Sequence, residues 1–182
     1  MKVNLSNYNN PDYNPGSKIK RGLWYICNHL FFRSAFFPFS SVKAMILRIF
    51  GARVGREVII KPRVNIKYPW FLKIGDFSWI GEEVWIDNLA MVTIGSNACL
   101  SQGALILCGN HDYTRENFDL RVRSINIEEG VWIGAKAIVT PGAHCKSHSI
   151  LAVGSVSPPK LEPYGIYRGN PAVLVKTRKI QK

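Results

Sequence analysis

The most constraining feature of this chain is an aliphatic residue that recurs with a period of six over most of its length. Fourteen six-residue units can be aligned, and thirteen of them begin with Val, Ile or Leu. A period of six is a multiple of the two-residue period of a β-strand, and it does not match the roughly 3.6-residue turn of an α-helix. The units begin at Val54, Ile60, Ile66, Ile74, Ile80, Ile86, Ile94, Leu100, Ile106, Ile127, Ile133, Val139, Cys145 and Leu151. This pattern predicts short strands joined by regularly repeated corners.

The fifth position of the unit is restricted as well. It is Val, Ala or Ser in twelve units, with Trp70 and Asn110 as the exceptions, and Gly is frequent at the second position, which suits a corner. Three units make a triangular coil of about eighteen residues whose first positions fill the interior. Residues 54–156 are therefore predicted to form an all-β fold, a parallel β-helix of about five triangular coils.

Residues 1–53 lack the repeat and are predicted to form a helical capping segment. Residues 18–33 and 40–50 have the pattern of short amphipathic helices, with Ser40 placed to cap the second helix and Gly51 to end it. Two roles remain open for them. They can cover the exposed strand edge of the first coil, and their basic and aromatic residues can contact an anionic membrane.

The net charge of +12 is concentrated at the two ends of the chain. Residues 1–50 hold seven Lys and Arg against one Asp, and residues 127–182 hold eight against three acidic residues. A basic C-terminal tail over 157–182 suits a phosphate-rich ligand. No recognition helix or stacking motif points to nucleic acid. The polar start without an apolar signal core predicts a cytoplasmic protein, with a peripheral position at the inner face of the cytoplasmic membrane left open.

The repeat is interrupted only once by a long segment, residues 112–126, which follows His111 directly. A long loop in a compact domain is usually functional. An imidazole titrates near neutral pH and so suits a general base that removes the proton of an attacking hydroxyl. No Gly-x-Ser-x-Gly nucleophile motif is present, which favours direct transfer without a covalent intermediate. His111 is therefore the predicted catalytic residue.

Several motifs resemble one known family. The stretches "WIDNLAMVTIG", "HDY…FDL" and "VWIGAKAIVTPG", and the ending "YGIYRGNPAVLVK", resemble the left-handed β-helix hexapeptide-repeat acyltransferases over about residues 54–175. Within that family they are most similar to the O-acetyltransferases of colanic-acid-type exopolysaccharide synthesis. Arg168 stands where the family ending usually has Ala. The resemblance implies left-handed coils, a homotrimer with sites between neighbouring prisms, acetyl-CoA as the acyl donor and no metal.

The resemblance also implies roles for individual residues. Asp87 and Asn88 match positions that hold the acceptor sugar in relatives. A groove for the pantetheine arm of coenzyme A matches Trp132, Gly134, Ala135, Val153, Gly154 and Ser155, where exposed backbone and small side chains would allow close approach. Lys160, Arg168, Lys176 and Arg178 are then available for the phosphates. The expected activity is acetyl-CoA-dependent O-acetylation of a sugar hydroxyl in surface-polysaccharide biosynthesis.

Other activities remain open at this point. N-acylation of an amino sugar on a sugar nucleotide would use the same donor. A zinc enzyme like the γ-class carbonic anhydrases would need three histidines, and His111, His144 and His148 are the candidates. A non-catalytic protein that binds a membrane or nucleic acid would use only the basic residues at the two ends of the chain.

Overall fold

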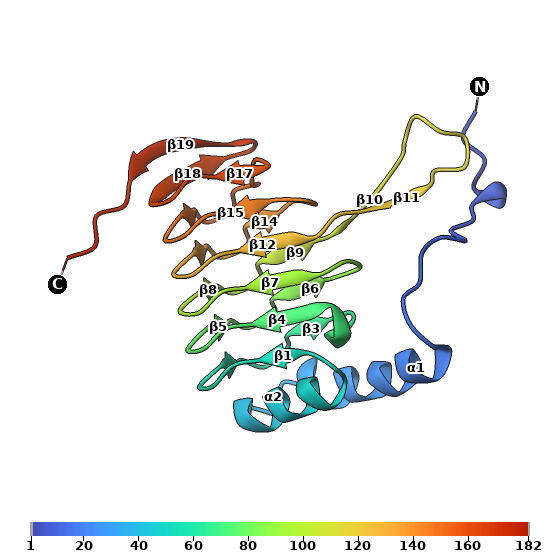
Figure 1. The fold of residues 1–182 in the computed structure, drawn as a ribbon, viewed down its shortest axis with the longest axis horizontal. Helices are drawn as coiled ribbons and strands as arrows, with labels where there is room; N and C mark the ends of the chain where they lie inside the picture. Colours follow the sequence, from blue (N-terminus) through green and yellow to red (C-terminus); the bar gives the residue numbers. More distant parts are fainter. Residues whose placement is uncertain (1, 182) are drawn as a thin grey trace.

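The computed structural model describes residues 2–181, and most of them wind into a three-sided prism of short parallel strands (Figure 1). The first side contains β1 (Arg53–Val54), β4 (Leu72–Ile74), β7 (Val92–Ile94), β12 (Ile125–Ile127), β15 (His144–Cys145) and β17 (Lys160–Leu161). The second contains β2 (Ile59–Ile60), β5 (Trp79–Ile80), β8 (Cys99–Leu100), β13 (Trp132–Ile133), β16 (Ile150–Leu151) and β18 (Gly165–Gly169), and is closed by the antiparallel β19 (Ala172–Thr177). The third contains β3 (Asn65–Ile66), β6 (Trp85–Asp87), β9 (Leu105–Leu107) and β14 (Ile138–Val139).

The predicted fold is confirmed, and the prism is slightly taller than expected. Its first side has six strands where about five coils were predicted. Strands β17 and β18 extend the stack beyond residue 156. Leu161 on β17 and Tyr167 on β18 supply further interior side chains, which are 0% and 7% exposed. Most of the predicted basic tail at 157–182 is therefore the last coil and its closing strand.

The first positions of the units form the interior of the prism. Ile60, Ile80, Leu100, Ile133 and Leu151 stand directly above one another on the second side, and all five are fully buried. Burying a side chain of this size contributes about 2 kcal/mol. The repeat read from the sequence is thus the hydrophobic core itself.

Glycine at the second position of a unit allows neighbouring coils to stack closely. A side-chain carbon added to Gly75 would lie 2.4 Å from the backbone nitrogen of Ser96 in the next coil. The left-handed backbone of each corner occurs two positions later, as at Phe77 and Asn97, which both have φ of 57°. These glycines are therefore required by contact between coils, and not by the corner conformation that the sequence suggested.

Helices close the lower end of the prism (Figure 1), and the first of the two predicted segments, 18–33, forms two of them. The helices at this end are α1 (Lys18–Cys27), the π-helix η2 (Asn28–Phe32) and α2 (Ser40–Ile49). Two 3-10 turns, η1 (Leu5–Asn7) and η3 (Pro69–Phe71), complete the helical elements of the described residues. Gly51 follows α2 with φ of 100° and ends it, whereas the hydroxyl of Ser40 does not cap the helix.

The polar side chains of these helices pair with the strand edge of the first coil. That edge presents backbone groups that have no lower strand to bond, and an unpaired edge invites association with other chains. Each side of the prism receives at least one bond. Examples are the bonds from Arg48 Nε to Val54 O (3.0 Å), from Ser40 Oγ to Ile60 O (3.2 Å) and from Trp24 Nε1 to Ile66 O (2.8 Å). The helices thus cover the edge, which is one of the two roles expected for them.

The interruption of the repeat is an antiparallel hairpin of β10 (Gly109–His111) and β11 (Leu120–Val122), which projects from the prism (Figure 1). The chain leaves the prism at Gly109, three residues before the predicted 112–126 loop, and β12 has already returned at Ile125. Residues 2–17, which we call the N-terminal arm, run from α1 up to this hairpin, where Asn4 N donates to Glu116 O at 3.0 Å.

Candidate active site

His111 lies at the end of β10, on the hairpin that projects from the prism. It pairs across the hairpin with Leu120. Its imidazole stacks on the ring of Phe118, with 4.4 Å between centroids and 9° between planes. Its Nδ1 lies 2.9 Å from the carbonyl oxygen of Phe118. Two contacts from one residue therefore fix both the position and the rotation of the ring.

The bond to Phe118 also determines which ring nitrogen carries the proton. A carbonyl oxygen can only accept a hydrogen bond, so Nδ1 must be the donor. The neutral imidazole then has an unprotonated Nε2, whose lone pair can accept a proton. This is the tautomer that a general base requires.

The carboxylate nearest to His111 in sequence has a different role. Asp112 is 4% exposed, and it accepts hydrogen bonds from the backbone and hydroxyl of Thr114 and from Arg121. The hydroxyl of Thr114, and the Arg121 and Arg115 cations, hold the pKa of this carboxyl below its usual range. Asp112 therefore orders the tip of the hairpin. The group that orients His111 is the backbone carbonyl of Phe118, and not this carboxylate.

The N-terminal arm lies against the hairpin on the side of His111. The ring of Tyr8 is 5.9 Å from the imidazole, and the side chain of Asn10 accepts a hydrogen bond from the backbone N–H of Leu120 at 3.2 Å. Tyr13 donates to the carbonyl of Leu89 at 2.9 Å. Burial, and then Tyr68 and Asp87, raise the pKa of its phenol above the usual range. Sequence reasoning missed this arm, whose only sign was two tyrosines in a polar, aperiodic stretch.

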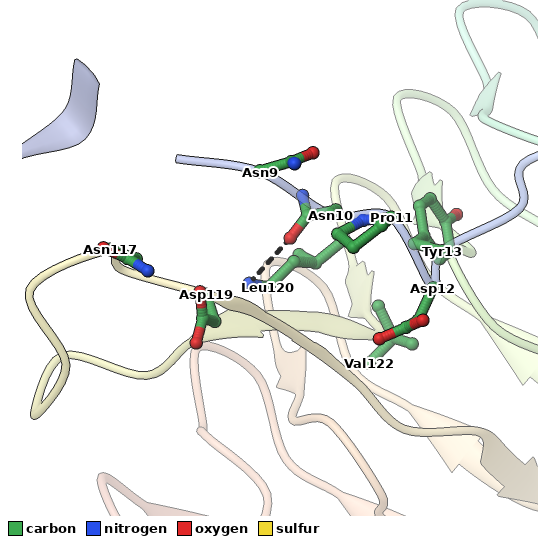
Figure 2. Close-up of a pocket in the computed structure, with 9 residues that line it drawn as sticks. All are labelled: Asn9, Asn10, Pro11, Asp12, Tyr13, Asn117, Asp119, Leu120 and Val122. Carbon is green, nitrogen blue, oxygen red and sulfur yellow. Dashed lines mark hydrogen bonds between the residues drawn. The ribbon is translucent and has the colours of Figure 1, made fainter. Parts of the chain in front are cut away.

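Two open cavities flank the hairpin. The first, of about 540 Å³, separates it from the arm, and Figure 2 shows the Asn10–Leu120 bond at its centre. Its lining consists of Asn9, Asn10, Pro11, Asp12 and Tyr13 from the arm and Asn117, Asp119, Leu120 and Val122 from the hairpin. The second, of about 420 Å³, is lined by His111 together with Arg121, Arg123, Thr140 and neighbouring loop residues. The imidazole is thus within reach of small molecules.

The two predicted acceptor residues have different environments. Asn88 is fully buried, and its amide bonds both the N–H and the carbonyl of Tyr68, at 3.0 and 2.6 Å. This amide holds two coils together, and a contact between Asn88 and the acceptor sugar stays a prediction. Asp87 is 8% exposed, and its carboxylate oxygen Oδ1 forms an ion pair with Lys67 Nζ at 3.1 Å.

The predicted groove residues divide into exposed and structural ones. Trp132 and Val153 are 45% and 69% exposed, and Ala135 and Gly154 lie near them at the surface of successive coils, with Gly154 N bonded to Ala135 O. Ser155 is buried, and its hydroxyl accepts a bond from Gly169 N at 3.0 Å.

Gly134 is also a structural residue. An added side-chain carbon would lie 2.6 Å from the backbone nitrogen of Val153, and the N–H of Gly134 is bonded to Leu151 O. Gly134 and Ser155 thus both serve the contact between coils, and their contact with the pantetheine arm stays a prediction.

The four predicted phosphate-binding residues divide in the same way. Arg178 donates to the carbonyls of Gly130 and His148 and so fastens the end of the chain to the prism. Lys160 is paired with Glu162 at 2.8 Å. Arg168 and Lys176 are exposed on β18 and β19, and within residues 2–181 neither makes an ion pair. These two cations are the ones available to an anionic ligand.

Comparison with known proteins places the chain in a family. No protein-family model matches it. It is 32% identical over 175 residues to WcaF, a colanic acid biosynthesis acetyltransferase of Escherichia coli strain K12, and the match covers 96% of both chains. The chain belongs to the colanic-acid-type hexapeptide-repeat acetyltransferases. This family assignment confirms the resemblance found in the sequence, and with it an acetyltransferase activity.

More distant relatives of this acetyltransferase share the fold. The galactoside O-acetyltransferase of Escherichia coli strain K12 is 26% identical over 128 residues, which are 69% of this chain and 63% of that one. A hexapeptide-repeat acetyltransferase of Vibrio cholerae, solved in complex with acetyl coenzyme A, superimposes with a TM-score of 0.80 at 21% identity and covers 90% of this chain and 89% of that one.

The two other histidines considered for a zinc site in this acetyltransferase are engaged elsewhere. The ring nitrogen Nε2 of His144 contacts the carboxylate of Glu128, and His148 stacks on Tyr164 at 4.9 Å. Within residues 2–181, no group of three or more His, Cys, Asp or Glu side chains is placed to hold a metal ion. Over the same residues, none of the helices combines the length and hydropathy needed to cross a bilayer.

Proposed function

We propose that this acetyltransferase moves an acetyl group from acetyl-CoA to a hydroxyl of a sugar in a surface-polysaccharide precursor. The observation that carries the proposal is the 2.9 Å contact of His111 Nδ1 with the Phe118 carbonyl, because it leaves Nε2 as a proton acceptor on a residue that lines an open cavity. The family assignment supports the acetyl group, and the O-acetyltransferase named among the relatives supports the hydroxyl.

The reaction we propose is a direct transfer. As the sugar oxygen attacks the thioester carbonyl, its proton passes to Nε2 of His111, and a C–O bond forms. The C–S bond then breaks, and the thiolate of coenzyme A leaves and takes up the proton. General-base catalysis of this kind typically contributes about 10²–10⁴ in rate. No residue needs to be acylated on the way.

The donor site we propose follows the exposed half of the predicted groove. Trp132, Ala135, Val153 and Gly154 would contact the pantetheine arm, and Arg168 and Lys176 would pair with the phosphates. Phosphate oxygens accept charge-assisted hydrogen bonds, which are stronger than neutral ones. The Vibrio cholerae relative solved with acetyl coenzyme A supports this choice of donor.

The acceptor side is proposed to involve Asp87 and a second copy of the chain. The carboxylate of Asp87, whose Oδ1 pairs with Lys67 Nζ at 3.1 Å, has acceptor capacity left for a sugar hydroxyl. We propose a homotrimer in which neighbouring prisms face each other across this site, as the family resemblance implies. A precursor carried on a lipid would be met at the inner face of the cytoplasmic membrane.

The test is a transfer assay with isotopically labelled acetyl-CoA and a panel of sugars, sugar nucleotides and lipid-linked oligosaccharides. Mass spectrometry should find one added acetyl group that mild alkali removes, since esters are cleaved under conditions that leave amides intact. An alkali-resistant product would establish N-acylation of an amino sugar instead. No labelled product with any acceptor, from protein that binds acetyl-CoA, would contradict the proposed acceptor class.

A further inference from the structure

The lower end of the molecule exposes an unusual number of large apolar side chains. Their exposed fractions range from 56% to 95%. We call this set the base surface, and it consists of Ile19, Leu23, Ile26, Leu30, Phe36 and Ile49. Isolated exposed apolar residues are ordinary on a soluble protein, but a contiguous group of them marks an interaction site.

The base surface faces away from the prism. In α1 and η2 the exposed residues follow a spacing of four, three and four, which places them along one side of the helical rod. The buried residues Trp24, Phe32 and Leu47 lie on the opposite sides of their helices, against the first coil. Figure 1 shows α1 and α2 lying across the end of the prism with no element of the described residues beneath them. The apolar stripe is therefore not needed for the fold.

The charge around the base surface has a single sign. Between Tyr13 and Arg56 the chain contains seven Lys and Arg residues and no Asp or Glu. Lys43 and Arg48 serve the edge of the first coil, whereas Lys18 and Arg33 lie near the two ends of the α1–η2 rod and make no ion pair within residues 2–181. Cations flanking an apolar stripe complement an anionic surface that has an apolar interior.

We propose that the base surface docks the enzyme onto an anionic lipid bilayer, with the helices lying in the headgroup region and the prism directed away from it. The apolar side chains would enter the boundary between headgroups and acyl chains, and Lys18 and Arg33 would meet lipid phosphates. A nucleic acid would satisfy the cations but leave the apolar stripe in water. The inference does not depend on the proposed reaction, since it rests on the surface alone.

The experiment is flotation of the full-length protein with vesicles of phosphatidylcholine alone and with phosphatidylglycerol added. Binding is expected only with phosphatidylglycerol. The double variant Leu23→Glu/Leu30→Glu should weaken it by at least about tenfold, because charged groups would face the acyl chains. Lys18→Gln and Arg33→Gln should each weaken it by about fivefold. Val173→Glu is the matched control, since Val173 is 61% exposed at the opposite end of the prism.

Thermal unfolding and acetyl transfer to a soluble acceptor would show that each variant remains folded, and this readout is independent of lipid. Three outcomes would overturn the proposal. Equal binding to both vesicle types would do so, and so would no binding to either. A smaller molar mass of the Leu23→Glu/Leu30→Glu variant by light scattering would show that the base surface joins copies of this chain.

Discussion

The carbonyl oxygen of Phe118 accepts a hydrogen bond from Nδ1 of His111 at 2.9 Å, seven residues back along the chain. Phe118 has a left-handed backbone, with φ of 53°, and this turns the hairpin so that its carbonyl and its ring both face the imidazole. The tight tip of the hairpin therefore selects the tautomer and rotation of the residue on which the proposed mechanism depends.

Replacing His111 by Ala is expected to lower kcat by about 10²–10⁴ with little change in the affinity for acetyl-CoA, since a general base acts mainly in the transition state. Steady-state kinetics and calorimetric titration measure the two effects separately. His148→Ala serves as the control, because His148 packs on Tyr164 away from the hairpin. Wild-type turnover by folded His111→Ala would remove this residue from the mechanism.

Phe118→Gly should lower kcat by roughly tenfold, less than loss of the imidazole itself. Glycine adopts a positive φ without strain and keeps the carbonyl that bonds Nδ1, so only the stacked ring is lost. Phe118→Val should be more harmful, because a β-branched residue is strained at a positive φ. Equal rates for the two variants would argue against backbone control of the imidazole.

Asn10→Ala removes the side chain that bonds the hairpin at Leu120. We expect activity to fall by roughly tenfold, through a looser catalytic hairpin, while the unfolding midpoint hardly changes because the arm lies outside the core. Kinetics and thermal unfolding test the two parts of this prediction. Asn14→Ala is the control on the same arm, and a similar loss of activity there would point to a general effect of the arm.

Gly75→Ala should destabilise the prism by about 1–3 kcal/mol, since the new carbon would meet the backbone of the next coil and overpacking has costs of this size. Gly22→Ala provides the matched control. Gly22 lies in α1 with no atom within 4 Å of an added carbon, so alanine should stabilise the helix by about 0.5–1 kcal/mol. Urea unfolding of both variants measures the two free energies of unfolding, and effects of the same sign would refute the role given to Gly75.

Lys43 should produce a measurable dependence of stability on pH. Burial lowers the pKa of its ammonium group from 10.5 to about 8. Between these two values the unfolded chain binds more protons than the folded one, so the free energy of unfolding rises with pH there. Relative to Lys43→Met, the wild type should gain at most about 3 kcal/mol between about pH 8 and about pH 10.5. A difference that does not vary with pH in urea unfolding would show that Lys43 is not desolvated.

Much of the fold could be predicted from the sequence because the prism is built from local repetition. Position one of each unit points inward at every turn, so a residue such as Ile80 is identified as core by its neighbours along the chain alone. The same periodicity showed where the hairpin departs to within three residues. It also drew attention to His111, because a single interruption is conspicuous in a regular pattern.

The tertiary structure establishes the contacts between segments that the six-residue repeat does not relate to each other. Asn10 meets Leu120 across 110 residues of chain, and this contact brings the N-terminal arm to the hairpin. Asn88 and Ser155 have the residue types of a binding site, yet both are buried in bonds between coils. The sequence alone determines which side chains lie at each turn of the prism. Only the packing of one coil on the next determines which of their polar groups are already bonded and which remain free for a substrate.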